Sequence, residues 1–267
     1  MSQNSKPWHL CSYIPEIRFR DYNVSVKAWQ NCKVSPRVAI LNYFDLKNSG
    51  LLRKPEKVRK SLDGSDALIL SCVGKDIDLD KLKVEDYFAT AKSIGVKAII
   101  TPDDFIYGLD NHYPAYQAHH FRRAVERSEA LIRLADTQLD VIGLVISANE
   151  YQMSLFVERF IEKGIRDFAC ACGDNMNRVK RVEGLKDIHA FMKCCANDWK
   201  LLLGVDSRMI LTRMPLPNAY SSSEWSYYAC HNMIYRDGKK RKVMSCDPKG
   251  WRLGLHNLYK NYEMMQR

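Results

Sequence analysis

The sequence lacks several features that would assign a protein class at once. No run of 18 or more apolar residues occurs, so no membrane-spanning helix is expected, and the polar N-terminus has no apolar signal region. The nine cysteines include no C-x-x-C pair, which argues against a zinc ribbon or a thioredoxin-type site. No Pro/Gly/Ser-rich linker and no low-complexity segment divides the chain. We therefore expect a cytoplasmic protein, in the host cytoplasm if it is viral, with reduced thiols.

No metal or other cofactor is predicted. The only alternative is a C-terminal zinc cluster, whose spacing matches no standard site. Its ligands would be Cys230, His231, Cys246 and His256. His119 and His120 are adjacent in a helical segment and are followed by two arginines, so we expect them at the surface rather than on a metal.

Length and charge favour a large domain with a polyanionic partner. A chain of 267 residues with 46% hydrophobic content can bury the core of one large α/β domain. Its formal net charge of +10 favours a polyanion, and nucleic acid is the commonest one. The densest basic run is "RDGKKRKV" (236–243), in which Lys239, Lys240 and Arg241 are predicted to contact phosphates. The alternative is a solvated hairpin tip.

Short apolar runs alternate with helical patterns along the chain. The candidate strands are 8–14, 37–44, 66–72, 96–101, 140–147, 166–172, 199–205 and 216–222. Most are continuous apolar runs, typical of parallel strands covered on both faces. Apolar stripes at helical spacing predict helices over 114–136, 150–164 and 185–197.

This rhythm predicts a single (β/α)₈ TIM-type barrel over residues 1–267, in which 226–267 form a C-terminal hairpin and helical extension. A doubly wound open sheet is the alternative. It would expect a glycine-rich phosphate turn after the first strand, and "SYIPEIRF" contains no glycine.

Catalytic residues of such a barrel come from the C-terminal ends of its strands. The residues at those ends are Asn42, Asp45, Ser71, Cys72, Asp103, Asp104, Ser147, Asn149, Gly173, Asp174, Asp206, Ser207 and 221–225. Carboxylates dominate without a matching histidine triad, which favours acid/base or carboxylate-nucleophile chemistry over acyl transfer. Asp103 and Asp104 could also be a cap or turn. Side-chain alternation predicts that Asp103 faces the pocket while Asp104 braces the loop.

Four segments carry a resemblance to a known family. "IITPDDFIYGLDNHYPAYQAHHFRRAVERSEALIRLAD" resembles the part of tRNA-guanine transglycosylases in which a strand delivers a catalytic aspartate. "IGLVISANEYQMSLFVERFIEKGIRDFACACGD" resembles that family's next strand, its Tyr-led helix and the glycine-containing strand end that holds the base. "LLLGVDS" and "NAYSSSEW…IYRDGKKRKV" resemble its last strands and the following hairpin. The likeness spans about residues 37–243, as order and pattern.

The resemblance implies exchange of guanine for a 7-deazaguanine on a nucleic acid. By position it implies that Asp103 recognises the base and handles its proton. The implied base-binding residues are Asp104, Ser147, Gly173 and Ser221. The family's nucleophilic aspartate falls near Ser221, where this chain has no aspartate, and Asp206 or Glu224 could replace it. The family's base-reading glutamine and its cysteine-rich zinc motif have no counterpart here.

These departures resemble the shortened phage and bacterial enzymes that insert 7-deazaguanines into DNA. The predicted activity is therefore that of a pentosyltransferase that replaces guanine in DNA with a 7-deazaguanine such as preQ0. DNA is preferred over tRNA because the chain lacks an appended RNA-binding domain and the zinc motif. The alternatives are a tRNA-directed transglycosylase, a catalytically diverged nucleic-acid-binding barrel, and an aldolase or lyase with a strand-end Schiff-base lysine. The sequence leaves the nucleophile, the deazaguanine and the oligomeric state (a homodimer among the options) open.

Overall fold

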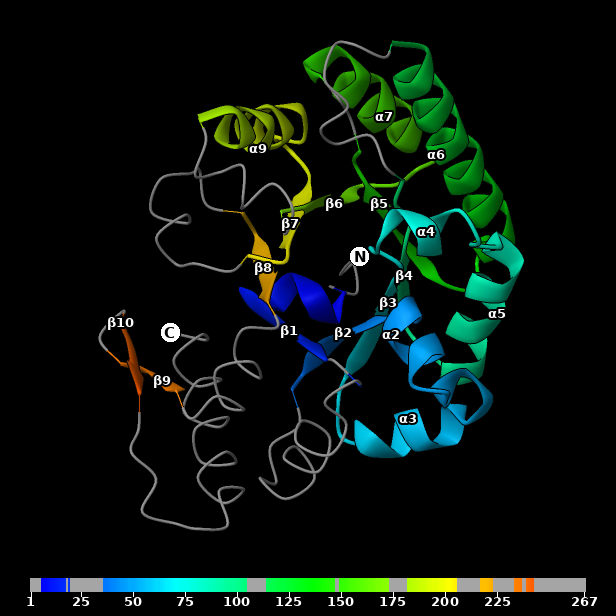
Figure 1. Ribbon diagram of the computed structural model, residues 1–267, viewed down its shortest axis with the longest axis vertical. Coiled ribbons are helices and arrows are strands. Elements are labelled where there is room, and N and C mark those ends of the chain that lie inside the picture. Colours follow the sequence, from blue (N-terminus) through cyan, green and yellow to red (C-terminus); the bar gives the residue numbers. More distant parts are fainter. Residues whose placement is uncertain are drawn as a thin grey trace, which may run out of the picture.

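A computed structural model describes residues 6–17, 19, 36–104, 114–146, 149–172, 182–205, 217–222, 233–236 and 239–242. Eight parallel strands close into a barrel in chain order (Figure 1). They are β1 (Tyr13–Ile17), β2 (Val38–Asn42), β3 (Ala67–Ser71), β4 (Ala98–Ile100), β5 (Asp140–Leu144), β6 (Asp167–Ala171), β7 (Trp199–Leu203) and β8 (Ala219–Ser222). The predicted (β/α)₈ barrel is confirmed.

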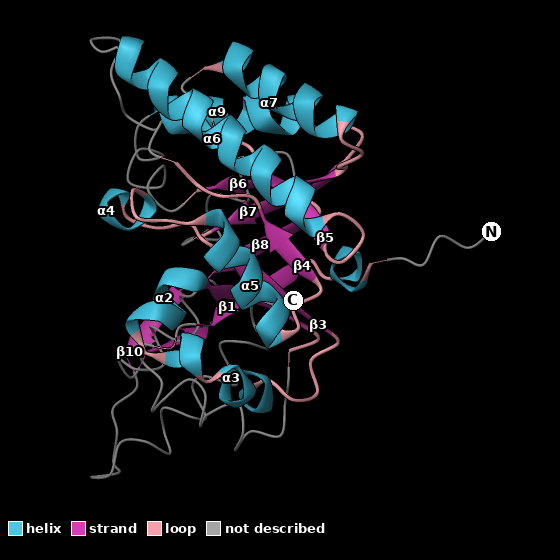
Figure 2. Cartoon of the chain, turned by 90° about the vertical axis from the view of Figure 1, so that its right-hand side faces the viewer, coloured by secondary structure: helices cyan, strands magenta, loops and turns pink. Residues whose placement is uncertain are grey.

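Helices lie between the strands and form the outer layer. They are α2 (Tyr43–Asn48), α3 (Pro55–Ser61), α4 (Asp76–Leu79), α5 (Val84–Ile94), α6 (Pro114–Ala135), α7 (Glu150–Glu162) and α9 (Val182–Cys194), with the 3-10 turns η1 (Pro7–Leu10) and η2 (Leu51–Arg53). Figure 1 shows α3, α5, α6, α7 and α9 following one another around the outside of the strands, and Figure 2 shows the same layer from the side. None of the described helices is long and apolar enough to cross a membrane.

Side-chain alternation divides the buried residues of the first four strands into two sets. Ile14, Ile40, Ile69 and Ile100 belong to one core cluster, in which they fill the barrel interior. Their neighbours in the strands, such as Ile17, pack in a second cluster with α2 and α5. Because both faces of each strand are covered, the strands appear in the sequence as continuous apolar runs rather than as alternating ones.

The first strand is the one element that the sequence misplaced. Residues 8–14 were predicted to form it, but Pro7–Leu10 form the 3-10 turn η1 and the strand is Tyr13–Ile17. The predicted range ended at Ile14, one residue before Pro15. In the barrel Pro15 is a strand residue, in register with Ser222 of β8. Each of the other seven predicted ranges contains its observed strand.

The turn η1 closes the N-terminal end of the barrel. Trp8 is buried and its Nε1 donates to Oδ2 of Asp167 at 3.0 Å. Lys6 Nζ lies 3.0 Å from the same oxygen, and His9 Nε2 lies 2.9 Å from Oδ1. Asp167 is therefore buried at the start of β6 but is paired with three side chains. In barrels of this kind, that end contributes stability rather than chemistry.

The basic run lies in a two-stranded antiparallel hairpin of β9 (Met233–Arg236) and β10 (Lys239–Lys242). Lys239 pairs with Arg236, and Lys240 pairs with Tyr235. The helical extension predicted beyond this hairpin lies outside the described residues.

Candidate functional site

The acidic pair Asp103–Asp104 follows β4 at the C-terminal edge of the barrel. Beyond Ile100, Thr101 continues the pairing with β5, because its amide donates to Ile142 O at 2.9 Å and its Oγ1 accepts from Leu144 N at 2.7 Å. Pro102, which has no N–H, follows Thr101. The two aspartates therefore come at the end of the barrel where enzymes of this fold carry their chemistry.

A buried tyrosine supports the strand ends beneath this pair. Tyr87 on α5 places its Oη 2.8 Å from Leu70 O and 2.9 Å from Ile100 O, so it connects the ends of β3 and β4. Cys72 follows β3 and hydrogen-bonds the backbone amide of Asp103. Burial raises the pKa of the Cys72 thiol to about 12, although this hydrogen bond lowers it. The thiol is therefore protonated at neutral pH and is not a nucleophile.

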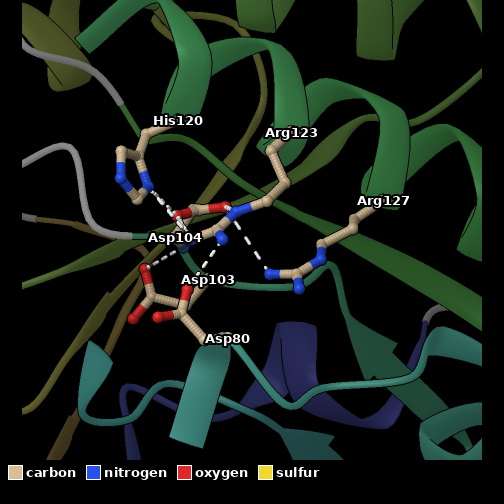
Figure 3. A network of polar contacts seen from close by, with 6 residues as sticks. All are labelled: Asp80, Asp103, Asp104, His120, Arg123 and Arg127. Atoms are coloured by element: carbon tan, nitrogen blue, oxygen red, sulfur yellow. Dashed lines mark hydrogen bonds and ion pairs between the residues drawn. The ribbon is translucent and has the colours of Figure 1, made fainter. Parts of the chain in front are cut away.

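Asp104 is the centre of a buried network of polar contacts with side chains of α6 (Figure 3). Arg123 donates to both of its oxygens, from Nε to Oδ2 and from Nη2 to Oδ1, each at 2.6 Å. His120 Nδ1 lies 2.6 Å from Oδ1. A carboxylate only accepts hydrogen bonds, so we assign the Nδ1 hydrogen to this contact. Arg127 Nη1 adds an ion pair at 3.6 Å from Oδ2.

Helical spacing explains how α6 presents these three side chains together. Residues 120, 123 and 127 are separated by three and four positions, so His120, Arg123 and Arg127 lie on one face of the helix. The prediction that both histidines lie at the surface is right for His119 and wrong for His120, which is 4% exposed. The carboxylate to which His120 binds is 16 residues away, and local periodicity does not reveal such a partner.

The two arginines of the network have opposite pKa shifts. The hydrogen bonds from Arg123 to Asp104 raise the pKa of Arg123, and an ion pair with Asp80 at 2.7 Å raises it further. Burial lowers the pKa of Arg127, and the neighbouring charge of Arg123 lowers it further. Arg127 Nη1 is buried and makes no hydrogen bond to the described residues. Arg123 therefore provides the strong contact to Asp104, and Arg127 contributes positive charge.

The two aspartates consequently have different surroundings. The side chain of Asp104 is fully buried, and Arg123 of α6 contacts both of its oxygens. These contacts support the bracing role predicted for Asp104, rather than the base-binding role implied by the resemblance. Asp103 is 5% exposed and its Oδ1 accepts the amide of Asp104 at 2.9 Å. The contacts of Asp104 therefore fix the backbone segment to which Asp103 belongs.

Other polar residues of the same edge hold its loops. Asn42 caps α2, since its Oδ1 accepts from Phe44 N and Asp45 N, and its Nδ2 donates to Val73 O at 2.7 Å. Asp45 accepts the amide of Phe19. Ser71 Oγ accepts from Val73 N at 3.3 Å. Their described contacts are structural.

Glu16 is the residue of this edge that sequence reasoning missed. Ser221, on β8, is fully buried and donates to Glu16 Oε1 at 2.5 Å. The amide of Gly204, after β7, donates to the same oxygen at 3.0 Å. The prediction ended the first strand at Ile14 and so left Glu16 outside it. The alternation from Ile14 to Glu16 would have indicated a carboxylate on the interior face.

Several predicted site residues cannot be placed. Those outside the described residues are Asp206, Glu224, Ser147, Gly173, Cys230, His231, Cys246 and His256. For Lys239, Lys240 and Arg241 only the backbone, within β10, is described. In the part of the chain that is described, no group of three or more His, Cys, Asp or Glu side chains could hold a metal ion.

The buried lysine of β7 weighs against the aldolase alternative. Lys200 Nζ donates to the carbonyls of Cys195, Ala196 and Asp198 at 2.6–3.2 Å. All three of its hydrogens are used to cap the end of α9. Lys200 is also the second residue of its strand, far from the C-terminal edge. It is not placed as a Schiff-base lysine.

No protein-family model and no curated protein matches this chain. Its function must therefore be argued from the residues at the C-terminal edge of the barrel.

Proposed function

We propose that the protein is a transglycosylase that exchanges guanine in DNA for a 7-deazaguanine, with Asp103 as the carboxylate that handles the proton of the base. The observation that carries this proposal is the position of Asp103. It is a nearly buried carboxylate after β4, on a backbone fixed by the Asp104 network. A carboxylate in such surroundings can exchange a proton with a ring nitrogen of a base.

The charge and the rim of the barrel support a nucleic-acid substrate. The net charge of +10 attracts phosphates, and the basic residues of β10 lie in a two-stranded hairpin. Ile77, Tyr116 and Tyr151 are large, exposed side chains in the first turns of α4, α6 and α7. These helices follow β3, β4 and β5, so the three residues lie at the same end of the barrel as Asp103. Exposed aromatic rings offer surfaces on which bases stack.

A second candidate is a nucleic-acid-binding barrel that has lost exchange activity. The observation that favours it is Ser221, which lies where the resemblance places the nucleophilic aspartate. Ser221 is fully buried and its hydroxyl is hydrogen-bonded to Glu16. Such a protein would bind DNA through the same rim without changing it.

One experiment separates these candidates. The protein is incubated with duplex DNA, single-stranded DNA or tRNA, together with isotope-labelled guanine or preQ0, and the nucleosides are analysed by mass spectrometry. Incorporation into DNA supports the proposal, and incorporation into tRNA alone assigns the tRNA-directed alternative. Binding without any incorporation identifies the second candidate. The Asp103→Asn protein serves as the control for adventitious enzyme.

A further inference from the structure

Glu16 lies where three strands meet at the C-terminal edge of the barrel. It belongs to β1, and its Oε1 accepts from the hydroxyl of Ser221 on β8 and from the amide of Gly204 after β7. Gly204 has a φ of 70°, a left-handed conformation that favours glycine. The end of β7 is therefore turned so that its amide reaches the carboxylate.

The alternation of β1 directs Glu16 into the barrel. Ile14 lies two residues earlier and is in the interior cluster with Ile40, whereas Ile17 packs in the outer cluster with α2 and α5. Residues two apart in a strand point to the same face, so Glu16 shares the interior direction of Ile14. It is half-buried, unlike the fully buried Ile14.

A carboxylate at an inward position of a barrel strand calls for an explanation. Branched apolar residues normally fill such positions, and burial disfavours a charge. Here Glu16 accepts two hydrogen bonds on one oxygen, and these contacts also fix the direction of the second oxygen. A side chain that only fills this space in the barrel would not need to be acidic. An apolar side chain of similar size would fill the space without the desolvation cost of a carboxylate.

Glu16 and Asp103 stand on separated strands of one mouth. β2 and β3 lie between β1 and β4 in the closed ring. Eight strands about 4.8 Å apart and tilted by about 36° form a ring roughly 15 Å across. Two carboxylates on separate strands of such a ring can address the two sides of one glycosidic bond, the arrangement that glycosyl transfer uses.

We propose that Glu16 is the nucleophilic carboxylate of this site, with Ser221 and the Gly204 amide as its positioning groups. The inference rests on the proposed function. It assigns to β1 the role that sequence reasoning sought at Asp206 or Glu224, and it explains why Ser221 is a serine: its hydroxyl orients a carboxylate that comes from the neighbouring strand.

The proposed step balances as follows. A Glu16 oxygen attacks C1′ of the deoxyribose, the bond from C1′ to guanine N9 breaks, and its electron pair stays on N9. Protonated Asp103 gives N9 a proton, so neutral guanine leaves and a deoxyribosyl ester of Glu16 remains. The incoming 7-deazaguanine transfers its ring N–H proton to Asp103 while the nitrogen attacks C1′. The ester bond breaks and the Glu16 carboxylate is restored.

The test is exchange of isotope-labelled guanine into DNA or tRNA, because this assay needs no knowledge of the natural deazaguanine. The wild-type chain is also quenched in acid with the nucleic acid alone, and peptide mass spectrometry locates the covalent adduct. We expect the adduct on Glu16. We expect Glu16→Gln, whose carbonyl oxygen can still accept from Ser221 and Gly204, to lose at least about 10³-fold in exchange rate.

Two further variants separate chemistry from structure. Ser221→Ala removes one donor to a charged acceptor and should reduce kcat about 10-fold, with KM for the nucleic acid unchanged, while the adduct stays on Glu16. Glu56→Gln alters an exposed glutamate on α3 and should leave exchange unchanged. Circular dichroism melts establish that each variant is folded.

The outcomes distinguish this inference from the function on which it rests. No exchange by the wild-type chain on DNA or tRNA would overturn both. Wild-type exchange that persists in Glu16→Gln, or an adduct on Asp206, Glu224 or another residue, would overturn the role of Glu16 and leave the transglycosylase intact. Wild-type exchange with the adduct on Glu16 establishes both.

Discussion

Arg123 holds Asp104 with two parallel hydrogen bonds of 2.6 Å, one to each carboxylate oxygen. This bidentate pair connects the segment after β4 to the outer helix α6, and His120 reinforces it on the same carboxylate. The pair is buried at the aspartate and partly exposed at the arginine. The two neighbouring aspartates therefore differ in role. Asp104 anchors the backbone, and Asp103 lies beside it at the C-terminal edge of the barrel.

The first prediction concerns stability. Asp104→Asn should lower the free energy of unfolding by about 3–5 kcal/mol, because it removes the buried charge that Arg123 and Arg127 of α6 contact. Asp66→Asn breaks the exposed pair of Asp66 with Arg37 and should change stability by less than about 1 kcal/mol. Urea titrations of both variants measure the difference. Equal losses in the two variants would show that Asp104 is not an anchor.

The second prediction concerns Asp103. Asp103→Asn keeps the shape of the side chain but removes its basicity, so exchange should fall by about 10²–10⁴-fold. The asparagine Oδ1 can still accept the amide of residue 104, so folding and DNA binding should persist. Rates of labelled-guanine incorporation, compared with those of Asp104→Asn, measure the effect. If Asp103→Asn keeps full activity while Asp104→Asn abolishes it, the catalytic carboxylate is Asp104 and not Asp103.

The third prediction concerns the basic hairpin. Replacing Lys239, Lys240 and Arg241 with glutamine should weaken binding to all DNA sequences alike. If all three contact phosphates, the slope of log K against log salt should decrease by about 2.7. The matched control removes the same charge from the opposite end of the barrel, as Lys92, Lys97 and Lys163 to glutamine. Unchanged affinity in the hairpin variant, or equal weakening in the control, would remove the hairpin from the DNA interface.

The fourth prediction concerns the aromatic rim. Tyr151 is 73% exposed at the start of α7, so Tyr151→Ala should leave the melting temperature unchanged. If a base stacks on its ring, affinity for single-stranded DNA should fall by about 1–3 kcal/mol. Leu10→Ala, an exposed apolar residue in the turn at the other end of the barrel, is the control. Fluorescence anisotropy with a labelled oligonucleotide measures both affinities.

The fifth prediction concerns pH. Burial raises the pKa of Cys72 to about 12 from a usual value near 9, so its protonated form is favoured in the folded state. Its contribution to stability is therefore complete below pH 9 and is lost as the pH rises from 9 towards 12. Within this window Cys72 adds a slope of up to about 1.4 kcal/mol per pH unit to the free energy of unfolding.

Cys72→Ala should flatten the alkaline part of the stability curve, as measured by urea titrations at several pH values. The same burial predicts that Cys72 resists alkylation in the native protein at pH 8, whereas the half-buried Cys194 reacts sooner. An unchanged slope in Cys72→Ala would show that this thiol does not titrate differently on folding.

Local chemistry in the sequence was sufficient to predict most of the fold. Continuous apolar runs indicate strands covered on both faces, and helical stripes between them indicate crossovers. These patterns depend only on neighbours within a few positions, and seven of the eight predicted ranges contain their observed strands. The exception was β1, whose predicted range ended at Ile14, whereas the observed strand runs through Pro15 to Ile17.

The sequence also determined that an acidic pair follows the fourth strand. Only the tertiary structure decided which of the two aspartates is anchored by other side chains. The anchoring of Asp104 depends on α6, whose contacting side chains follow it by 16–23 residues. The contact between Glu16 and Ser221 joins residues 205 positions apart and exists because the barrel closes β1 against β8. Closure depends on the packing of the whole chain, and no local period encodes which side chains it brings together.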